Sequence, residues 1–236
     1  MMQLYYVNTF LSKHMLGNPA AVLLLDQWLP DTELQSIATS IGLPATAFLI
    51  YEKNKFCIRW FTPDYELDIC GHATMAAAHV IFDKIQSESR QIDFDGRTSV
   101  KAKHENNLIF LDFPKKNIEP CPGMALLTQG LGIKPKYIYQ HQSERCLAVF
   151  ETEEEVRILK PDMSLLRQLP YRGIDVTAQG KDVDFICRTF YPRKAMTEDA
   201  VCGAAHCLLV PYWAKRLNKI NLHSHQASER GGELFC

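Results

Sequence analysis

The stretch Asp68–Phe82 reads DICGHATMAAAHVIF, and its pattern returns at Glu198–Trp213, which reads EDAVCGAAHCLLVPYW. In each stretch an acidic residue precedes a Cys-Gly pair, and a run rich in Ala follows. Gly lets other groups approach the backbone closely, and Ala is the best helix former. Both stretches therefore predict a helix that begins at the Cys-Gly pair. We expect the first helix to reach about Asp83 and the second to reach about Leu217.

A cysteine at a helix start lies at the positive end of the helix dipole, beside N–H groups without partners inside the helix. Such a position binds anions and lowers the pKa of a thiol. Two such positions, one from each half, predict a site for a small carboxylate with a proton-transfer group on each side. Cys70 and Cys202 are therefore candidate catalytic residues, and His72 beside Gly71 is a candidate proton carrier.

The same residues also fit plainer roles. Free cysteines are often small buried residues, and His79 and His206 are expected to pack or to face solvent within the helices. A metal site built from Cys70, His72, Cys202 and His206 is a further alternative. Its spacing matches no standard ligand pattern, so we predict no metal.

Strand-like runs outnumber helical ones around both stretches. They include FCIRWF and NLIFLDF in the first half, and RCLAVF, VRILK and INLHSHQ in the second. Asp31 is expected to be the N-cap of a helix that ends near Ile41. Residues 114–123, PKKNIEPCPG, hold three prolines and are interpreted as a linker. The pattern predicts an α+β protein with two pseudo-repeated halves, residues 1–115 and 116–236.

Composition excludes several classes of protein. The chain has 236 residues, of which 47% are hydrophobic and 22% charged, and its net charge is −1. This balance favours neither nucleic acid nor a membrane as a partner, and no run approaches the roughly 20 apolar residues that span a bilayer. The N-terminus shows no signal-peptide pattern, and the eight cysteines form no C-x-x-C pair. We expect a cytoplasmic protein with free thiols.

Several segments together resemble the PhzF, or phenazine biosynthesis-like, family: GNPAAVLLL, TAF, FTPDYELDICGHATMAAAHVIF, RTFYPRKAMTEDAVCGAAHCLLVPYWAKRL and QASERGGEL. The resemblance covers nearly the whole chain. It implies a fold similar to diaminopimelate epimerase, in which two pseudo-symmetric halves each wrap a mixed or antiparallel sheet around a central helix. It further implies a site in the cleft between the halves, a homodimer, and an isomerase that acts without a cofactor on a small carboxylate substrate.

The resemblance also carries over functional positions. His72 and Asp199 match catalytic positions of the family. Substrate-binding positions are implied at Gly71, Ala73, Gly203, Ala204 and Asn18. Ala204 stands where PhzF-type enzymes usually have Ser.

Two departures from the family pattern bear on mechanism. The family isomerase carries its acid/base Glu in a Ser-Glu-Thr-Ala-Phe stretch, and here Ala45 takes that place, with no group that can carry a proton. Cys202 stands where PhzF-type members often have Thr. Related proline racemases and diaminopimelate epimerases use two thiols, each followed by Gly. This chain therefore keeps the two-thiol pattern and lacks the Glu. The family commonly continues beyond the Arg-Gly-Gly-Glu-Leu stretch, so the second half is expected to be short at its C-terminus.

Beside the less favoured reading of a zinc-dependent enzyme, three hypotheses remain open at this point. The first is a two-thiol racemase or epimerase that uses Cys70 and Cys202. The second is a proton shift that uses His72 and Asp199. The third is a catalytically silent binding or interaction protein on the same scaffold, which Ala45 motivates.

Overall fold

The computed structural model describes residues 3–142, 144–194 and 196–236. Its contacts divide the chain into two compact units, which we describe separately. Unit 1 holds the chain up to Thr9 together with Asn18–Pro114, and unit 2 holds Phe10–Gly17 together with Lys115–Cys236. A short segment near the N-terminus therefore packs with the second half of the chain, which no sequence pattern indicated.

Unit 1 is built on one mixed sheet. Its strand order is β1-β2-β3-β4-β6-β7-β8, with the two-residue β5 paired to β4. The β2–β3 and β4–β6 pairs are parallel and the others are antiparallel. The strands are β1 (Gln3–Thr9), β2 (Asn18–Leu24), β3 (Thr46–Glu52), β4 (Lys55–Phe61), β5 (Glu66–Leu67), β6 (Gln91–Asp95), β7 (Val100–Glu105) and β8 (Leu108–Asp112).

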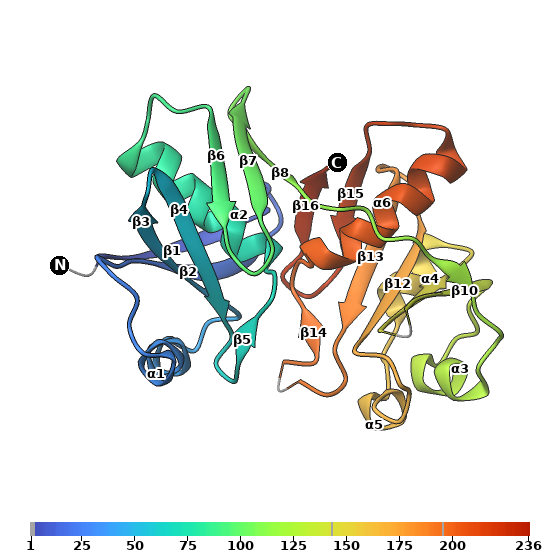
Figure 1. Cartoon of the computed structure of the whole chain (residues 1–236). Helices are drawn as coiled ribbons and strands as arrows, with labels where there is room; N and C mark the ends of the chain where they lie inside the picture. The colour runs from blue at the N-terminus through green and yellow to red at the C-terminus, as the bar shows by residue number, and fades with distance from the viewer. Residues whose placement is uncertain (1–2, 143, 195) are drawn as a thin grey trace. The chain divides into compact units, whose positions relative to one another are not determined.

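Two helices cover opposite faces of this sheet. Helix α2 (Gly71–Val80) runs into a π-helical turn, η1 (Ile81–Ile85), and lies against the sheet in Figure 1. Its alanines are fully buried in one apolar cluster with side chains of β2, β3 and β4. Small side chains on α2 let the helix approach the sheet closely, and larger side chains of the sheet, such as Trp60 and Phe94, fill the rest of this core. Helix α1 (Asp31–Ile41) packs against the other face in a separate apolar cluster.

Unit 2 repeats this plan with a second mixed sheet. Its order is β16-β15-β13-β12-β11-β10-β9, with β14 paired to β13. The strands are β9 (Glu119–Pro120), β10 (Tyr137–His141), β11 (Arg145–Val149), β12 (Gly173–Gln179), β13 (Phe185–Phe190), β14 (Glu198–Asp199), β15 (His223–Gln226) and β16 (Gly232–Phe235). The long helix α6 (Gly203–Leu217) covers one face, and α3 (Ala125–Leu131), α4 (Glu153–Ile158) and α5 (Met163–Leu166) belong to the cluster on the other.

The two sheets share pairing pattern and register. In unit 2 the β11–β12 and β13–β15 pairs are parallel, as β2–β3 and β4–β6 are in unit 1. Thr189 pairs with Asp199 as Trp60 pairs with Leu67, and in both units the chain reaches its Cys-Gly three residues later. The predicted α+β fold, with a mixed sheet wrapped around a central helix in each pseudo-symmetric half, is confirmed.

Some local predictions were wrong. The run VRILK is not a strand, because Glu153–Ile158 forms helix α4 behind a capping box between Thr152 and Glu155. Asp31 is the first helical residue and Pro30 is the N-cap. The expected linker contains the short β9, and β6 and β16 are strands that the sequence reading did not include.

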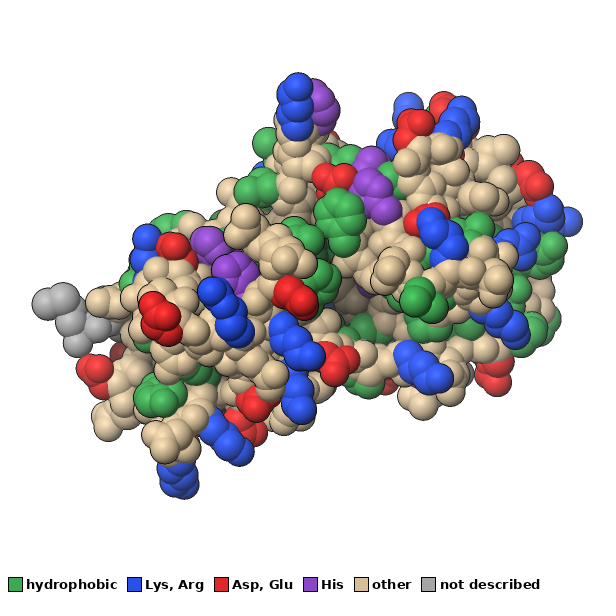
Figure 2. Space-filling view, turned by 90° about the horizontal axis from the view of Figure 1, so that it is seen from above, with side chains coloured by type: hydrophobic (Ala, Val, Ile, Leu, Met, Phe, Trp, Pro, Cys, Tyr) green, Lys and Arg blue, Asp and Glu red, His purple; other side chains and the backbone are tan. Residues whose placement is uncertain are grey.

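The surface of the protein carries charges of both signs. Figure 2 shows Lys and Arg side chains interspersed with Asp and Glu over the face in view, in keeping with the net charge of −1. Within residues 3–142, 144–194 and 196–236, no helix has the length and apolar character needed to cross a bilayer.

Candidate active site

A thiol and an imidazole meet at the start of α2. Cys70 is the N-cap residue in an extended conformation, and its Sγ lies 3.5 Å from Nδ1 of His72. Thr74 donates both its backbone N–H and its hydroxyl to the carbonyl oxygen of Cys70, at 3.0 and 2.7 Å. Both Cys70 and His72 are buried. The first turn of α2 therefore fixes a Cys–His pair that can exchange a proton.

Cys70 also belongs to the apolar core of unit 1. Ala45 and Ala73 are fully buried in the same cluster as Cys70. The carbonyl oxygen of Ala45 accepts a hydrogen bond from the N–H of Ala21 at 3.1 Å. Asn18, at the start of β2, is also fully buried, and its carbonyl oxygen accepts from the hydroxyl of Thr9. The position where the family isomerase carries Glu is thus part of the hydrophobic core of unit 1.

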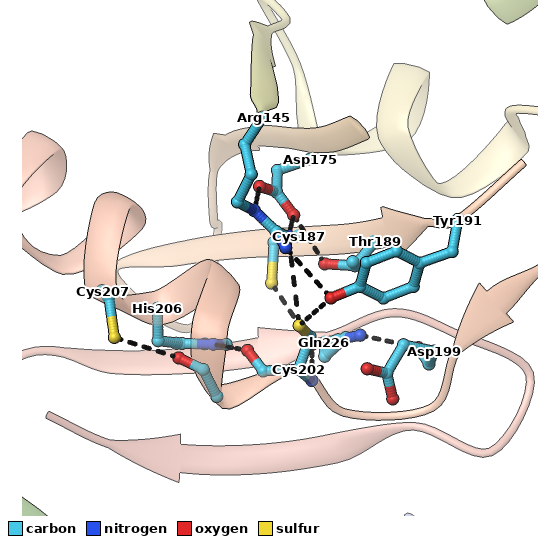
Figure 3. A network of polar contacts seen from close by, with 11 residues as sticks. Arg145, Asp175, Cys187, Thr189, Tyr191, Asp199, Cys202, His206, Cys207 and Gln226 are labelled. Carbon is cyan, nitrogen blue, oxygen red and sulfur yellow. Dashed lines mark hydrogen bonds and ion pairs between the residues drawn. The ribbon is translucent and has the colours of Figure 1, made fainter. Parts of the chain in front are cut away.

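Side chains from β15 and α6 hold the N-cap of α6. Cys202 is that N-cap, and its N–H donates to Oε1 of Gln226 at 2.8 Å. The amide of Gln226 donates in turn to the carbonyl oxygen of Asp199 at 2.7 Å. His206 donates from Nδ1 to the carbonyl oxygen of Cys202 at 2.8 Å, which leaves Nε2 to accept from the hydroxyl of Ser224 at 3.1 Å. Strand β15 therefore anchors the start of the helix (Figure 3).

A buried ion pair lies behind the thiol of Cys202. Arg145 donates from Nε and Nη2 to the two carboxylate oxygens of Asp175, at 2.9 and 2.6 Å. Its Nη1 donates to the hydroxyl of Tyr191 at 3.0 Å, and that hydroxyl lies 3.2 Å from Sγ of Cys202. Nη2 also lies 4.0 Å from this sulfur. Thr189 donates to Asp175 at 2.9 Å, which completes the network in Figure 3.

This environment sets the protonation of the groups around the thiol. Burial, and then the negative charge of Asp199, raise the pKa of Cys202 to about 12, against the lowering effects of Arg145 and of the Tyr191 hydroxyl. Burial likewise raises the pKa of Tyr191 well above its ordinary value and lowers the pKa of His206. At neutral pH Cys202 is therefore a thiol that can give a proton. The guanidinium of Arg145 is placed to stabilise the thiolate that remains.

The two Cys-Gly helix starts have different chemistry around them. Phe61 and Phe190 are equivalent, because they pair with Glu66 and Glu198 respectively. Counting from them along the paired strands gives three further equivalences. Arg145, Asp175 and Thr189 occupy the places that Ala20, Ala47 and Trp60 hold in unit 1. Charged and hydroxyl groups thus lie beside Cys202, whereas the equivalent strand positions in unit 1 carry apolar side chains.

The structure groups the predicted site residues unit by unit. Unit 1 brings together Cys70, Gly71, His72 and Ala73 at the start of α2, while Asn18 begins β2. Unit 2 brings together Asp199, Cys202, Gly203 and Ala204 at the start of α6. Their roles stay predictions.

Sequence reasoning missed the polar partners of Cys202. Arg145 and Asp175 are single charged residues inside the apolar strand runs RCLAVF and GIDVTAQ. An isolated charge in a buried strand signals a paired or functional group, and that signal was available. The partners themselves are 30 residues apart in the chain, so no local spacing connected them.

Comparisons with known proteins agree with this architecture. An uncharacterized isomerase of Pseudomonas aeruginosa is 42% identical over 236 residues, covering 100% of this chain and 90% of the relative. A crystal structure of a PhzF-family phenazine biosynthesis protein from Enterococcus faecalis is 39% identical with a TM-score of 0.92, covering 99% of this chain and 90% of that one. A predicted epimerase from Pseudomonas aeruginosa shares the fold, with a TM-score of 0.72 at 15% identity, covering 98% of this chain and 90% of that one. The family model for phenazine biosynthesis-like protein matches residues 7–236, and the chain therefore belongs to that family, PhzC-PhzF.

Proposed function

We propose that this protein is an isomerase that moves a proton on a small carboxylic acid without a cofactor. The observation that carries the proposal is the thiol of Cys202, which sits at the N-cap of α6 in contact with Tyr191 and beside the buried Arg145. Relatives named as uncharacterized isomerases, such as those of Pseudomonas aeruginosa and Halalkalibacterium halodurans, support the reaction class.

The first turn of α6 supplies the means to bind the substrate carboxylate. Its N–H groups and the helix dipole attract an anion. Gly203 and Ala204 are half-buried and carry little or no side chain, so a carboxylate can approach the backbone. Gly71 opens α2 in the same way. The small residues at these positions fit a ligand held mainly by the backbone.

In the proposed reaction the two thiols have opposite roles. The raised pKa of Cys202 makes it the proton donor, and Arg145 with Tyr191 stabilises the sulfur as its S–H bond breaks. Cys70, paired with His72, is the acceptor: its thiolate takes the proton from the substrate carbon, and the electron pair of that C–H bond delocalises toward the carboxylate. Cys202 then returns a proton to a carbon of the same substrate. The charge balances, since one thiolate becomes a thiol and one thiol a thiolate.

Two other readings define the alternatives. A proton shift through His72 and Asp199 would leave both sulfurs dispensable. The silent-scaffold reading draws on Ala45, which is fully buried in the core of unit 1 and has no acidic group to take the part of the family Glu. The experiment below separates the three.

The test is proton exchange in D₂O, followed by NMR on a panel of amino, imino and cyclic hydroxy acids. We expect exchange with at least one compound, and a fall of about 10²–10⁴-fold in both Cys70→Ala and Cys202→Ala. Cys207→Ala is the matched control, because this thiol lies on the same helix and donates to the Gly203 carbonyl oxygen. Exchange that survives both changes would move the chemistry to His72 and Asp199. Binding without exchange would favour the silent scaffold.

The proposal includes a cellular setting and an assembly. All eight cysteines are free, which fits a reducing compartment, so we place the protein in the cytoplasm. We also propose a homodimer, as the family resemblance implies. Light scattering of the purified protein should then give about twice the chain mass of 26.9 kDa, and a value near one chain mass would reject the dimer.

A further inference from the structure

Two histidines and a glutamate gather on the hairpin of β15 and β16 in unit 2. His223 and His225 are two positions apart on β15, so their side chains share one face of the strand. Glu233 lies directly opposite His225 in the antiparallel register. Its Oε1 is 2.7 Å from Nε2 of His223 and 3.6 Å from Nε2 of His225. The three potential ligand atoms all lie within 4.8 Å of one another.

We propose that His223, His225 and Glu233 form a binding site for a divalent transition metal, with Zn²⁺ as the best match. Imidazole nitrogen and carboxylate oxygen are ordinary zinc ligands, at about 2.0–2.2 Å. In a tetrahedral site such bonds place ligand atoms about 3.4 Å apart, and the observed separations bracket this value. Three protein ligands leave the fourth position to water. The cluster shares no residue with the Cys70–His72–Cys202–His206 set that the sequence suggested.

The ligands are held in place by their surroundings. The ring of His223 stacks on Phe235, with centroids 4.7 Å apart and an interplanar angle of 9°. The backbone N–H of His223 donates to Oδ2 of Asp184 at 2.9 Å. The same carboxylate pairs with Lys219 at 2.5 Å, which offsets the positive charge of that side chain. The three side chains are between 21% and 34% exposed, so an ion has a path from solvent.

The position of this site connects it to the start of α6. Ser224 and Gln226 alternate with the two histidines along β15 and point to the other face of the strand. There they contact His206 and the N–H of Cys202. A metal that joins β15 to β16 would therefore steady the strand that anchors the N-cap of α6. It would not take part in proton transfer.

The test is calorimetric titration of the full-length, EDTA-treated protein with Zn²⁺. We expect one ion per chain and a rise in melting temperature, because binding only to the folded state stabilises it. Glu233→Gln and His225→Ala should each weaken binding by about tenfold or more. His79→Ala is the control, since His79 is exposed on α2 in unit 1, and its affinity should match that of the unchanged protein.

Co²⁺ absorption distinguishes this site from the free cysteines. Imidazole and carboxylate ligands give visible bands alone, whereas thiolate ligands add a strong near-ultraviolet band. Visible bands that Glu233→Gln removes would support the proposal. Absence of binding, an affinity unchanged in both variants, or a thiolate band would overturn it. Glu233→Gln preserves shape, so the test holds even if His225→Ala does not fold.

Discussion

Arg145 and Asp175 form a buried ion pair, and breaking it should lower the free energy of unfolding. Only 7% of the Arg145 side chain and none of the Asp175 side chain are exposed. Arg145→Ala leaves a buried carboxylate without its main partner, and such a change costs about 3–5 kcal/mol. Urea unfolding followed by circular dichroism measures this loss. Arg97→Ala is the control, because Arg97 is 56% exposed and surface pairs contribute about 0–1 kcal/mol.

Replacing both partners of this pair separates charge from packing. Arg145→Met combined with Asp175→Leu should recover much of the stability lost in Arg145→Ala, since an apolar pair leaves no unpaired charge. If Arg145→Ala alone unfolds at the same urea concentration as the unchanged protein, the pair does not stabilise unit 2. The double variant should nevertheless lose proton exchange, because the thiolate of Cys202 then has no guanidinium beside it.

The buried imidazole of His206 should make stability depend on pH. Burial lowers its pKa in the folded state from the ordinary value of 6.5. The unfolded chain therefore takes up a proton below pH 6.5 that the folded chain resists, so the free energy of unfolding falls as pH falls from about 7 toward the lower folded pKa. Urea unfolding at a series of pH values gives the slope. His206→Gln should reduce that slope, and the exposed His79→Gln should not; equal slopes in all three proteins would contradict the prediction.

At the level of residues, sequence predicted half of the candidate site. The two Cys-Gly pairs were recognisable because a local signal, Gly followed by Ala-rich helix, marks them. The groups that set the properties of Cys202 come from separate parts of the chain: Arg145 lies in β11, Asp175 in β12, and Tyr191 directly after β13. Strand order and register decide such neighbours, and neither can be read from local spacing.

Helices and strands were predicted best where the signals in the local sequence agree with the packing in the folded protein. Residues 31–41 form a helix that ends at Gly42 as expected, and residues 203–217 form the second expected helix, although Pro211 lies within it. The run VRILK alternates in a strand-like way, yet the capping box of Thr152 and Glu155 starts a helix just ahead of it. That box is a local signal that outweighed apolar alternation.

The contact between α3 and α5 gives a prediction at the scale of elements. Gly130 lies in α3, and a Cβ added there would come within 2.6 and 2.9 Å of Cδ2 and Cγ of the buried Leu166. Gly130→Ala gains about 1 kcal/mol of helix propensity but overpacks the contact at a cost of about 1–3 kcal/mol. We expect a net loss of about 1 kcal/mol in the free energy of unfolding, from the difference of these terms.

Gly123 provides the matched control for that change. A Cβ added there meets no atom within 4 Å, so Gly123→Ala should alter stability by no more than about 0.5 kcal/mol. Chemical unfolding of both variants beside the unchanged protein is the measurement. A higher unfolding midpoint for Gly130→Ala than for Gly123→Ala would contradict the prediction. It would mean that Leu166 in α5 can move away from the added methyl group at little cost.

At the scale of the whole molecule, the two units share a fold but differ in the side chains beside their Cys-Gly helix starts. Matching strand pairs and matching Cys-Gly helix starts occur in both units. In unit 2 a buried Arg–Asp pair and a tyrosine lie beside the cysteine. At three equivalent strand positions, unit 2 has Arg145, Asp175 and Thr189 where unit 1 has Ala20, Ala47 and Trp60. A proton-transfer reaction needs such a difference, because donor and acceptor must hold different protonation states at the same pH.

Residues Phe10–Gly17 belong to unit 2, although the chain before and after them belongs to unit 1. We call this segment the crossing, and we expect it to open more readily without Arg230. The guanidinium of Arg230 donates to the carbonyl oxygens of Gly17 and Leu16, at 2.8 and 3.2 Å. Hydrogen bonds from a charged donor contribute about 1.5–3 kcal/mol. Arg230→Ala should therefore speed amide exchange of Leu16 and Gly17 by about tenfold or more, since 1.4 kcal/mol corresponds to a factor of ten. Peptides from β3 and β4 in unit 1 should keep their protection.

Hydrogen–deuterium exchange with mass spectrometry resolves these segments in the intact chain. Arg193→Ala is the matched control, because Arg193 also donates to a backbone carbonyl in unit 2, that of Leu169, but does not touch the crossing. If Arg230→Ala speeds exchange throughout both units alike, the crossing opens only with the whole fold. If it leaves Leu16 and Gly17 protected, their backbone bonds to Arg230 and Gly231 hold the segment by themselves. We expect faster exchange only at Leu16 and Gly17, because these are the residues whose carbonyl oxygens accept hydrogen bonds from the Arg230 side chain.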